Sequence, residues 1–206
     1  RSTLFPYTTL FRSPYSQIRQ MLDKHLPASS DGPMTRIQSL KNAGDYAQAR
    51  TALEQLLARD PDNIALQTES AELHALDGDL DTARQKLQAL QAKEPTHPAV
   101  KRLAALIAFS DVIAQYPDVR SLREQVAAQR VQDETQGLEL HHALAVHQLL
   151  GGDVEPALQT WLGIMRDHRS WKDDLARRSL VLAFELIGDA DPIVAQTRRA
   201  MTRLLF

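Results

Sequence analysis

The sequence contains no cysteine, so disulfide scaffolding, thiol catalysis and cysteine-ligated zinc are excluded. It also has no excess of basic residues: 24 Lys and Arg stand against 26 Asp and Glu, a formal net charge of −2. Because nucleic-acid-binding domains carry a basic stripe or patch, we expect no nucleic-acid partner. No apolar run approaches the roughly 20 residues of a membrane-spanning helix. The best run, residues 180–184, ends at Glu185, and we expect no membrane association.

Motifs of catalysis are missing as well. No nucleophile–base pair, phosphate-binding loop or glycosidase-like pair of carboxylates stands out, so we expect neither an enzyme nor a cofactor. His141, His142 and His147 lie near Glu139, which suggests a metal site at first sight. On a helix, however, positions 141 and 147 point about 240° apart. We therefore interpret these histidines as residues of a helix surface, with no metal bound.

The most informative positive feature is an internal repeat. Segment 44–50, GDYAQAR, returns 34 residues later as segment 78–84, GDLDTAR, and Pro61 returns as Pro95. A period of 34 with a Gly-Asp turn, an alanine five residues after the glycine and a closing proline is the tetratricopeptide signature. Such repeats are pairs of helices that stack around a shared core and present an extended concave surface. The sequence thus predicts an all-α solenoid of the tetratricopeptide type.

Helix periodicity and end signals place the elements. We expect Gly44 to end its helix in the left-handed conformation and Asp45 to cap the next one. A third copy of the turn, GDVEPA at 152–157, has Trp161 in the position of Leu53, but lies six residues beyond the 34-residue register. The middle of the array is therefore irregular. The expected helices cover residues 16–26, 34–43, 46–59, 64–76, 79–92, 99–109, 119–129, 134–150, 171–187 and a last segment from 192.

These elements suggest a division of the chain. Residues 1–13 contain a near-duplicate, STLF and TTLF, and resemble translated sequencing-adapter read-through, so we expect a non-native leader there. Residues 28–33 have the composition of a linker. We expect the repeats to occupy residues 34–170. A helical pair over residues 171–206 would close the solenoid as its C-terminal cap.

Several strings outside the repeats carry a family resemblance. Segment 16–27, SQIRQMLDKHLP, looks like the last helix of a thioredoxin-like domain. The C-terminal part holds WKDD at 171–174, FELIG at 184–188, DPIV at 191–194 and a closing LLF. Over residues 14–206 this arrangement resembles the bacterial thioredoxin-like co-chaperones with C-terminal tetratricopeptide repeats, the chaperedoxin family. The resemblance implies that 14–27 is a remnant of the thioredoxin-like domain, and that this chain carries no redox role. Thr197 departs from the family, which often has an aromatic residue there.

The resemblance implies a function and partners. Such proteins are cytoplasmic holdases that bind unfolding clients and deliver them to a chaperonin or to the Hsp70 system. Their last helix is implicated in docking on the chaperonin; the alternative is that this helix only packs as the solenoid cap. The residues carried over as candidates for chaperonin docking are Arg198, Arg199, Arg203, Leu204, Leu205 and Phe206.

The concave groove is the second candidate site. Repeat geometry predicts that client segments contact Met34, Gln38, Lys41, Thr68, Glu72, Arg102, Leu106 and Phe109. An ordinary solvated surface is the alternative for these positions. A clamp for acidic C-terminal peptides needs Lys and Asn where Met34 and Gln38 stand, so we do not expect that mode of binding.

Three functional hypotheses remain open at this level. The first is a co-chaperone that holds unfolding clients. The second is a scaffold or adaptor that binds one specific folded partner in the repeat groove. The third is an enzyme regulator fused to a catalytic domain outside this sequence. Suppression of aggregation of unrelated proteins distinguishes the first from the second, and the gene upstream of Pro14 tests the third.

Overall fold

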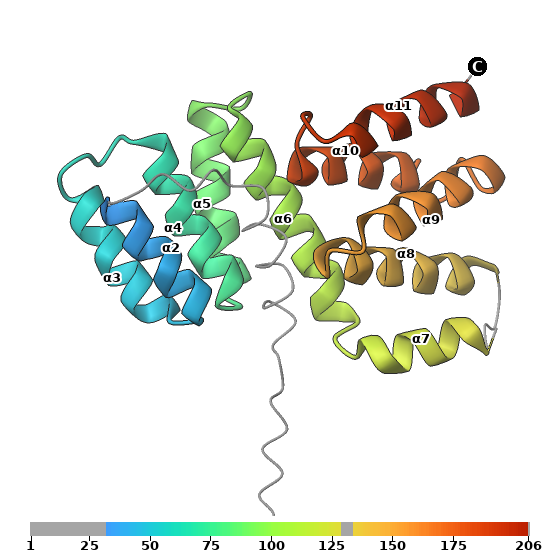
Figure 1. Cartoon of the computed structure of the whole chain (residues 1–206), viewed down its shortest axis with the longest axis horizontal. Coiled ribbons are helices and arrows are strands. Elements are labelled where there is room, and N and C mark those ends of the chain that lie inside the picture. The colour runs from blue at the N-terminus through green and yellow to red at the C-terminus, as the bar shows by residue number, and fades with distance from the viewer. Residues whose placement is uncertain (1–31, 129–133, 206) are drawn as a thin grey trace, which may run out of the picture.

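A computed structural model of the chain describes residues 32–128 and 134–205, and its regular elements in these ranges are all α-helices (Figure 1). The expected all-α helical solenoid is confirmed. The predicted leader, the predicted remnant at 14–27 and most of the linker lie outside the described residues. The helices are α2 (Pro33–Ala43), α3 (Tyr46–Leu57), α4 (Ile64–Leu76), α5 (Leu80–Lys93), α6 (Pro98–Gln115), α7 (Val119–Ala127), α8 (Glu134–Leu150), α9 (Val154–Asp167), α10 (Leu175–Ile187) and α11 (Pro192–Leu205).

The first two repeats fold as the sequence predicts. α2 packs on α3 and α4 packs on α5, and each turn contains a glycine at positive φ, 76° at Gly44 and 88° at Gly78. Only glycine adopts this backbone region at no steric cost. The carboxylate of Asp45 accepts a hydrogen bond from the Gln48 amide at 3.1 Å and so caps α3. Ala49 is fully buried where the paired helices cross. Its small side chain allows this close approach, since a larger one would force the helices apart.

The third unit departs from the repeat plan. The predicted helix 99–109 is too short, because α6 continues to Gln115 and ends only before Tyr116 and Pro117. No Gly-Asp turn interrupts it near Ser110, so the helix runs on. It contacts α4 and α5 of the N-terminal half, and it also contacts α8 and α10 of the C-terminal half (Figure 1). α7 packs on α8. One long helix therefore joins both halves of the molecule.

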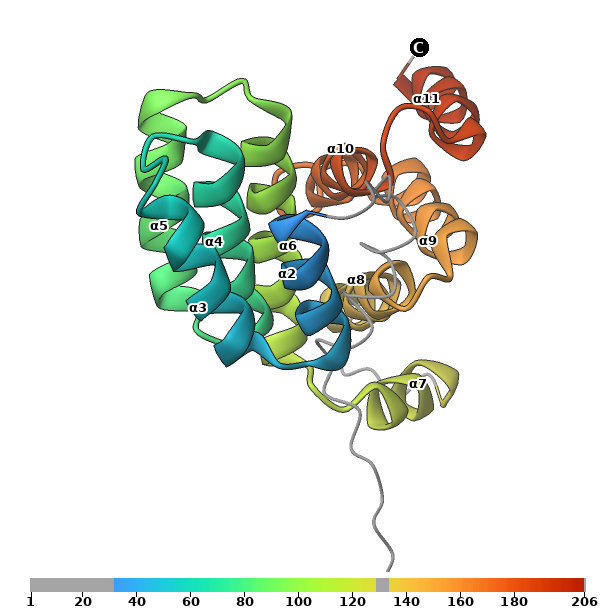
Figure 2. The ribbon, with the colours of Figure 1, turned by 60° about the vertical axis from the view of Figure 1, so that its left-hand side comes forward.

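The C-terminal half is built around Trp161 of α9, which is fully buried. The predicted helix 171–187 begins later, at Leu175. Lys172, Asp173 and Asp174 have φ values of 44°, 54° and 58°, which lie in the left-handed region and are incompatible with a right-handed helix. α11 stands at the outer edge of the fold in both views (Figure 2). No helix in the described part of the chain is long and apolar enough to cross a membrane.

Candidate functional site

The concave face is formed by the first helices of the repeats, α2, α4 and the start of α6. It is less exposed than the sequence predicts. Met34 is exposed and Gln38 half-buried at the N-terminal end, and Glu72 and Arg102 are half-buried farther along. The other four predicted client residues are buried, and in this structure they do not form an open surface: Lys41, Thr68, Leu106 and Phe109.

Lys41 is buried within a charged cluster. Only 2% of it is exposed, and its ammonium donates hydrogen bonds to Glu69 Oε1 at 2.5 Å and to Glu72 Oε1 at 2.9 Å. Burial opposes the charged form of Lys41, but the charges of Glu72 and Glu69 outweigh it and raise its pKa above the ordinary value. Burial, aided by Glu72, raises the pKa of Glu69. Glu69 is not among the predicted groove residues, although it lies one turn before Glu72 on the same helix.

Arg102 of α6 lies beside this cluster, and its charge acts on Glu69 to lower that carboxyl's pKa. Its guanidinium nitrogens Nε and Nη2 are buried and have no hydrogen-bond partner among the described residues. A buried donor without an acceptor costs about 1–3 kcal/mol, so few persist in folded proteins without a reason. Because Arg102 as a whole is only half-buried, a shift of its side chain would bring these donors to the surface, where an acceptor on a bound molecule would satisfy them.

The remaining buried residues have ordinary structural contacts. The Thr68 hydroxyl donates to the Ile64 carbonyl of its own helix at 2.7 Å. Phe109 stacks on Trp161, with ring centroids 5.6 Å apart and planes inclined by 11°. Leu106 belongs to the same core. Because α8 and α10 pack on α6, they close the groove that a regular array would leave open there.

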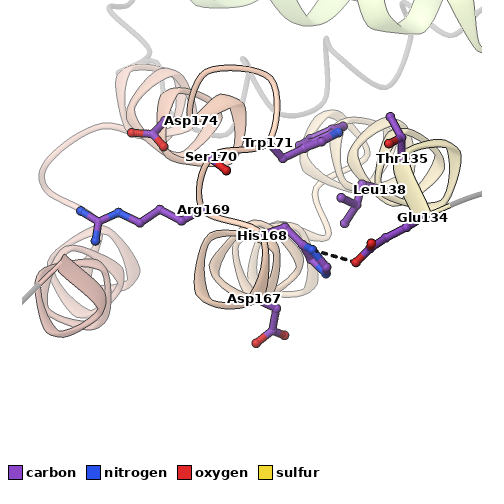
Figure 3. Close-up of a pocket in the computed structure, with 9 residues that line it drawn as sticks. All are labelled: Glu134, Thr135, Leu138, Asp167, His168, Arg169, Ser170, Trp171 and Asp174. Atoms are coloured by element: carbon purple, nitrogen blue, oxygen red, sulfur yellow. Dashed lines mark ion pairs between the residues drawn. The ribbon is translucent and has the colours of Figure 1, made fainter.

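A hollow of about 560 Å³ lies between the start of α8 and the turn that joins α9 to α10. The ion pair between His168 Nδ1 and Glu134 Oε1, 3.0 Å long, joins the two sides (Figure 3). The Asp167 and Arg169 side chains point away from Trp171 (Figure 3). This hollow depends on the left-handed turn at residues 172–174, so no sequence pattern predicts it. Its lining is Glu134, Thr135, Leu138, Asp167, His168, Arg169, Ser170, Trp171 and Asp174.

α11 divides into a packed face and an exposed face. Val194 and Thr197 are buried, and Leu204 packs half-buried against the core. Thr197 is thus a packing residue of this face. Arg199 and Arg203, two of the predicted docking residues, are exposed on the other face.

The third arginine of α11 is engaged within the chain. Arg198 Nη2 donates to Asp189 Oδ1 at 2.6 Å, and its guanidinium lies 5.1 Å from the centroid of the Phe184 ring. Phe206 and the side chain of Leu205 lie outside the described residues. The predicted docking set therefore separates into exposed arginines and a leucine, Leu204, that contributes to packing.

The prediction that the three histidines of α8 lie on the helix surface is wrong for two of them. His141 is exposed, but His142 and His147 are buried. Trp161 Nε1 donates to His142 Nδ1 at 3.0 Å, and burial, aided by the Lys172 charge, lowers the pKa of His142 to about 4. His147 Nε2 lies 2.6 Å from the Tyr116 carbonyl oxygen. Among the described residues, no group of three His, Asp or Glu side chains is placed to hold a metal ion.

Comparison with known proteins supports the prediction of tetratricopeptide repeats. Two family models, each described as tetratricopeptide repeat, match residues 40–107 and 112–206. No curated protein matches the chain. A solved structure, that of a domain of protein VP0806 (unknown function) from Vibrio parahaemolyticus, is 19% identical and covers 84% of this chain and 98% of its own, with a TM-score of 0.37. The predicted repeats are confirmed, and repeats of this kind bind protein partners.

Proposed function

We propose that this tetratricopeptide-repeat solenoid is an adaptor that binds a polar segment of a specific protein partner on the concave face of α2, α4 and α6. The observation that carries the proposal is the pair of buried, unpartnered guanidinium nitrogens of Arg102. Among the described residues, the large apolar side chains that are exposed are Met34 on α2 and Val181 on α10. Recognition on this face therefore depends on polar groups more than on apolar burial.

The neighbours of Arg102 define the chemistry of the bound segment. The charges of Lys41 and Arg102 balance those of Glu69 and Glu72, so the cluster has no net positive charge to attract a further carboxylate. A backbone carbonyl or the amide oxygen of Asn or Gln accepts from a guanidinium without bringing another charge into this partly buried cluster. We therefore expect an uncharged, hydrogen-bonding segment at this position.

Site-specific photo-crosslinking tests the proposal. With p-benzoylphenylalanine in place of the exposed Met34, the full chain in its host cells should give one dominant adduct. Arg102→Gln should reduce this adduct at least five-fold. Arg120→Gln is the matched control, because Arg120 sits on α7 in a solvent-exposed pair with Glu124. A broad set of adducts that is insensitive to Arg102→Gln would contradict the adaptor.

A second candidate is a cytoplasmic co-chaperone that holds unfolding clients and delivers them to a chaperonin or to Hsp70. Two observations favour it: the resemblance of the C-terminal strings to the chaperedoxin family, and the exposed arginines Arg199 and Arg203 on α11. In this hypothesis α11 is the docking element. The segment 14–27 then remains a proposed remnant of a thioredoxin-like domain.

Binding to purified bacterial chaperonin tests this candidate. The double variant Arg199→Glu, Arg203→Glu changes only exposed positions, so the fold should survive and docking should be lost. The full chain should also suppress aggregation of two unrelated unfolded proteins, citrate synthase and luciferase. Absence of chaperonin binding and of aggregation suppression would leave the adaptor as the better account.

A further inference from the structure

A second hollow, of about 400 Å³, lies on the face built by the second helices of the repeats. The end of α3, the turn between α3 and α4, and α5 surround it, while α4 contributes to its base. This hollow is separate from the concave face described above and shares no residue with it. Its lining is Leu57, Pro61, Gln67, Ser70, Lys86, Ala89, Leu90 and Lys93.

The hollow has an apolar interior. Leu90 is buried, Leu57 is half-buried, and Pro61 and Ala89 are exposed. The Gln67 side chain donates to the Pro61 carbonyl at 2.5 Å and so holds the turn against α4. Preformed hollows of a few hundred Å³ with apolar walls and few polar groups are typical of binding sites. This volume accommodates one bulky side chain of a partner.

Two lysines give the rim of the hollow a positive charge. Lys86 and Lys93 lie on α5 seven residues apart, about 10 Å along the helix axis. No acidic residue lines the hollow. Asp62 lies 3.7 Å from the Lys93 ammonium, but it is 92% exposed and Lys93 is 56% exposed, so this pair is weak. Both ammonium groups are thus available to carboxylates of a partner.

The hollow is not a general consequence of the repeat. One period of 34 residues after Leu57 stands the polar Gln91, near the end of α5. In the next unit the register is lost, because α6 runs on to Gln115 and α7 packs on α8. The apolar interior between α3 and α5 is specific to this pair of repeats.

We propose that the hollow docks a short segment of a partner protein that carries one leucine or phenylalanine between two acidic residues. The apolar side chain occupies the space beside Leu57 and Leu90, and the carboxylates pair with Lys86 and Lys93. In an extended segment, carboxylates three or four residues apart span about 10–13 Å, which matches the separation of the lysines. The charge of the rim and the size of the hollow select this chemistry, independently of what the concave face binds.

Titration of the isotope-labelled full chain with a synthetic peptide, acetyl-Gly-Ser-Glu-Ser-Leu-Ser-Glu-Ser-Gly-amide, tests the proposal by nuclear magnetic resonance. Amide shifts should concentrate on the end of α3, the following turn and α5. Binding should weaken at least ten-fold when the peptide leucine is replaced by serine or its glutamates by lysine. Raising the salt concentration should also weaken it, since the carboxylates contact partly exposed lysines.

Matched variants of the chain sharpen the test. Lys86→Gln with Lys93→Gln should weaken binding about ten-fold and flatten the salt dependence, whereas Lys101→Gln, an exposed lysine outside the hollow, should change nothing. Leu57→Gln, which installs the residue of the next repeat, should also weaken binding, with circular dichroism to establish that the variant is folded. Absence of shifts at millimolar peptide, or equal binding of the leucine-free peptide, overturns the proposal. Shifts around Met34 and Arg102 instead would also overturn it, while leaving the adaptor function intact.

Discussion

Arg50 Nη1 lies 2.6 Å from Asp77 Oδ2 and so connects the second helix of one repeat to the end of the first helix of the next. One period of 34 residues later, Arg84 pairs with Asp111 in the same way. The array thus repeats an inter-repeat ion pair as well as its turns. The series ends there, because the long α6 breaks the 34-residue register and Asp118, one period after Arg84, caps the start of α7.

We expect the Arg50–Asp77 pair to contribute little to stability. Both side chains are partly exposed, and pairs of this kind contribute about 0–1 kcal/mol. A double-mutant cycle with Arg50→Gln and Asp77→Asn, measured by urea unfolding, should give a coupling free energy in that range. A coupling of more than about 2 kcal/mol would show that the pair sets the stacking of the repeats.

The buried lysine should behave differently. Lys41→Met leaves Glu69 and Glu72 partly buried without their counterion, and should reduce the free energy of unfolding by about 3–5 kcal/mol. The triple variant Lys41→Met, Glu69→Gln, Glu72→Gln removes all three charges and should recover most of that loss. Chemical unfolding of the two variants checks this. A triple variant no more stable than Lys41→Met would rule out the uncompensated carboxylates as the cause.

Trp161 should be sensitive to both its ring and its N–H group. Trp161→Ala empties a fully buried position beside Phe109 and should cost about 3–5 kcal/mol. Trp161→Phe keeps an aromatic ring but leaves His142 Nδ1 without its donor, and should cost about 1–3 kcal/mol. Trp171→Phe is a useful comparison, because Trp171 Nε1 has no hydrogen-bond partner among the described residues. Equal destabilisation by the two Trp→Phe changes would contradict a contribution from the Trp161–His142 hydrogen bond.

Stability should fall in mild acid because of His142. Its pKa is lowered from 6.5 to about 4 in the folded chain, so the unfolded chain binds the proton first. The stabilisation is complete above pH 6.5 and is lost as the pH falls from 6.5 towards 4, by about 3 kcal/mol over the full interval. Thermal unfolding at several pH values should show this slope. His142→Gln, which retains an acceptor for Trp161, should show a smaller slope; an unchanged slope would assign the acid sensitivity to other groups.

Local signals predicted much of the fold. α4 and α8 begin and end where the sequence places them, because Gly-Asp turns and helix caps act over a few residues. α10 begins four residues later than predicted, since the left-handed turn at Lys172–Asp174 has no glycine to announce it. The period of 34 predicts that Leu106 and Phe109 lie in the groove. They are buried by α8 and α10, and such contacts between distant segments leave no periodic signal. The hollow between α3 and α5 likewise depends on how these helices pack, so no sequence pattern predicts it.

The long helix α6 has a consequence for how the molecule unfolds. In a regular array each repeat contacts only its neighbours, and the ends exchange their amide hydrogens far faster than the middle. Here Arg102 faces the first half and Phe109 is anchored in the second, about two turns away on one rigid helix. Unfolding of either half exposes the face of α6 that it covers and so weakens the helix on which the other half packs. Amide protection in α4 and in α9 should therefore be lost together, as a single cooperative unit.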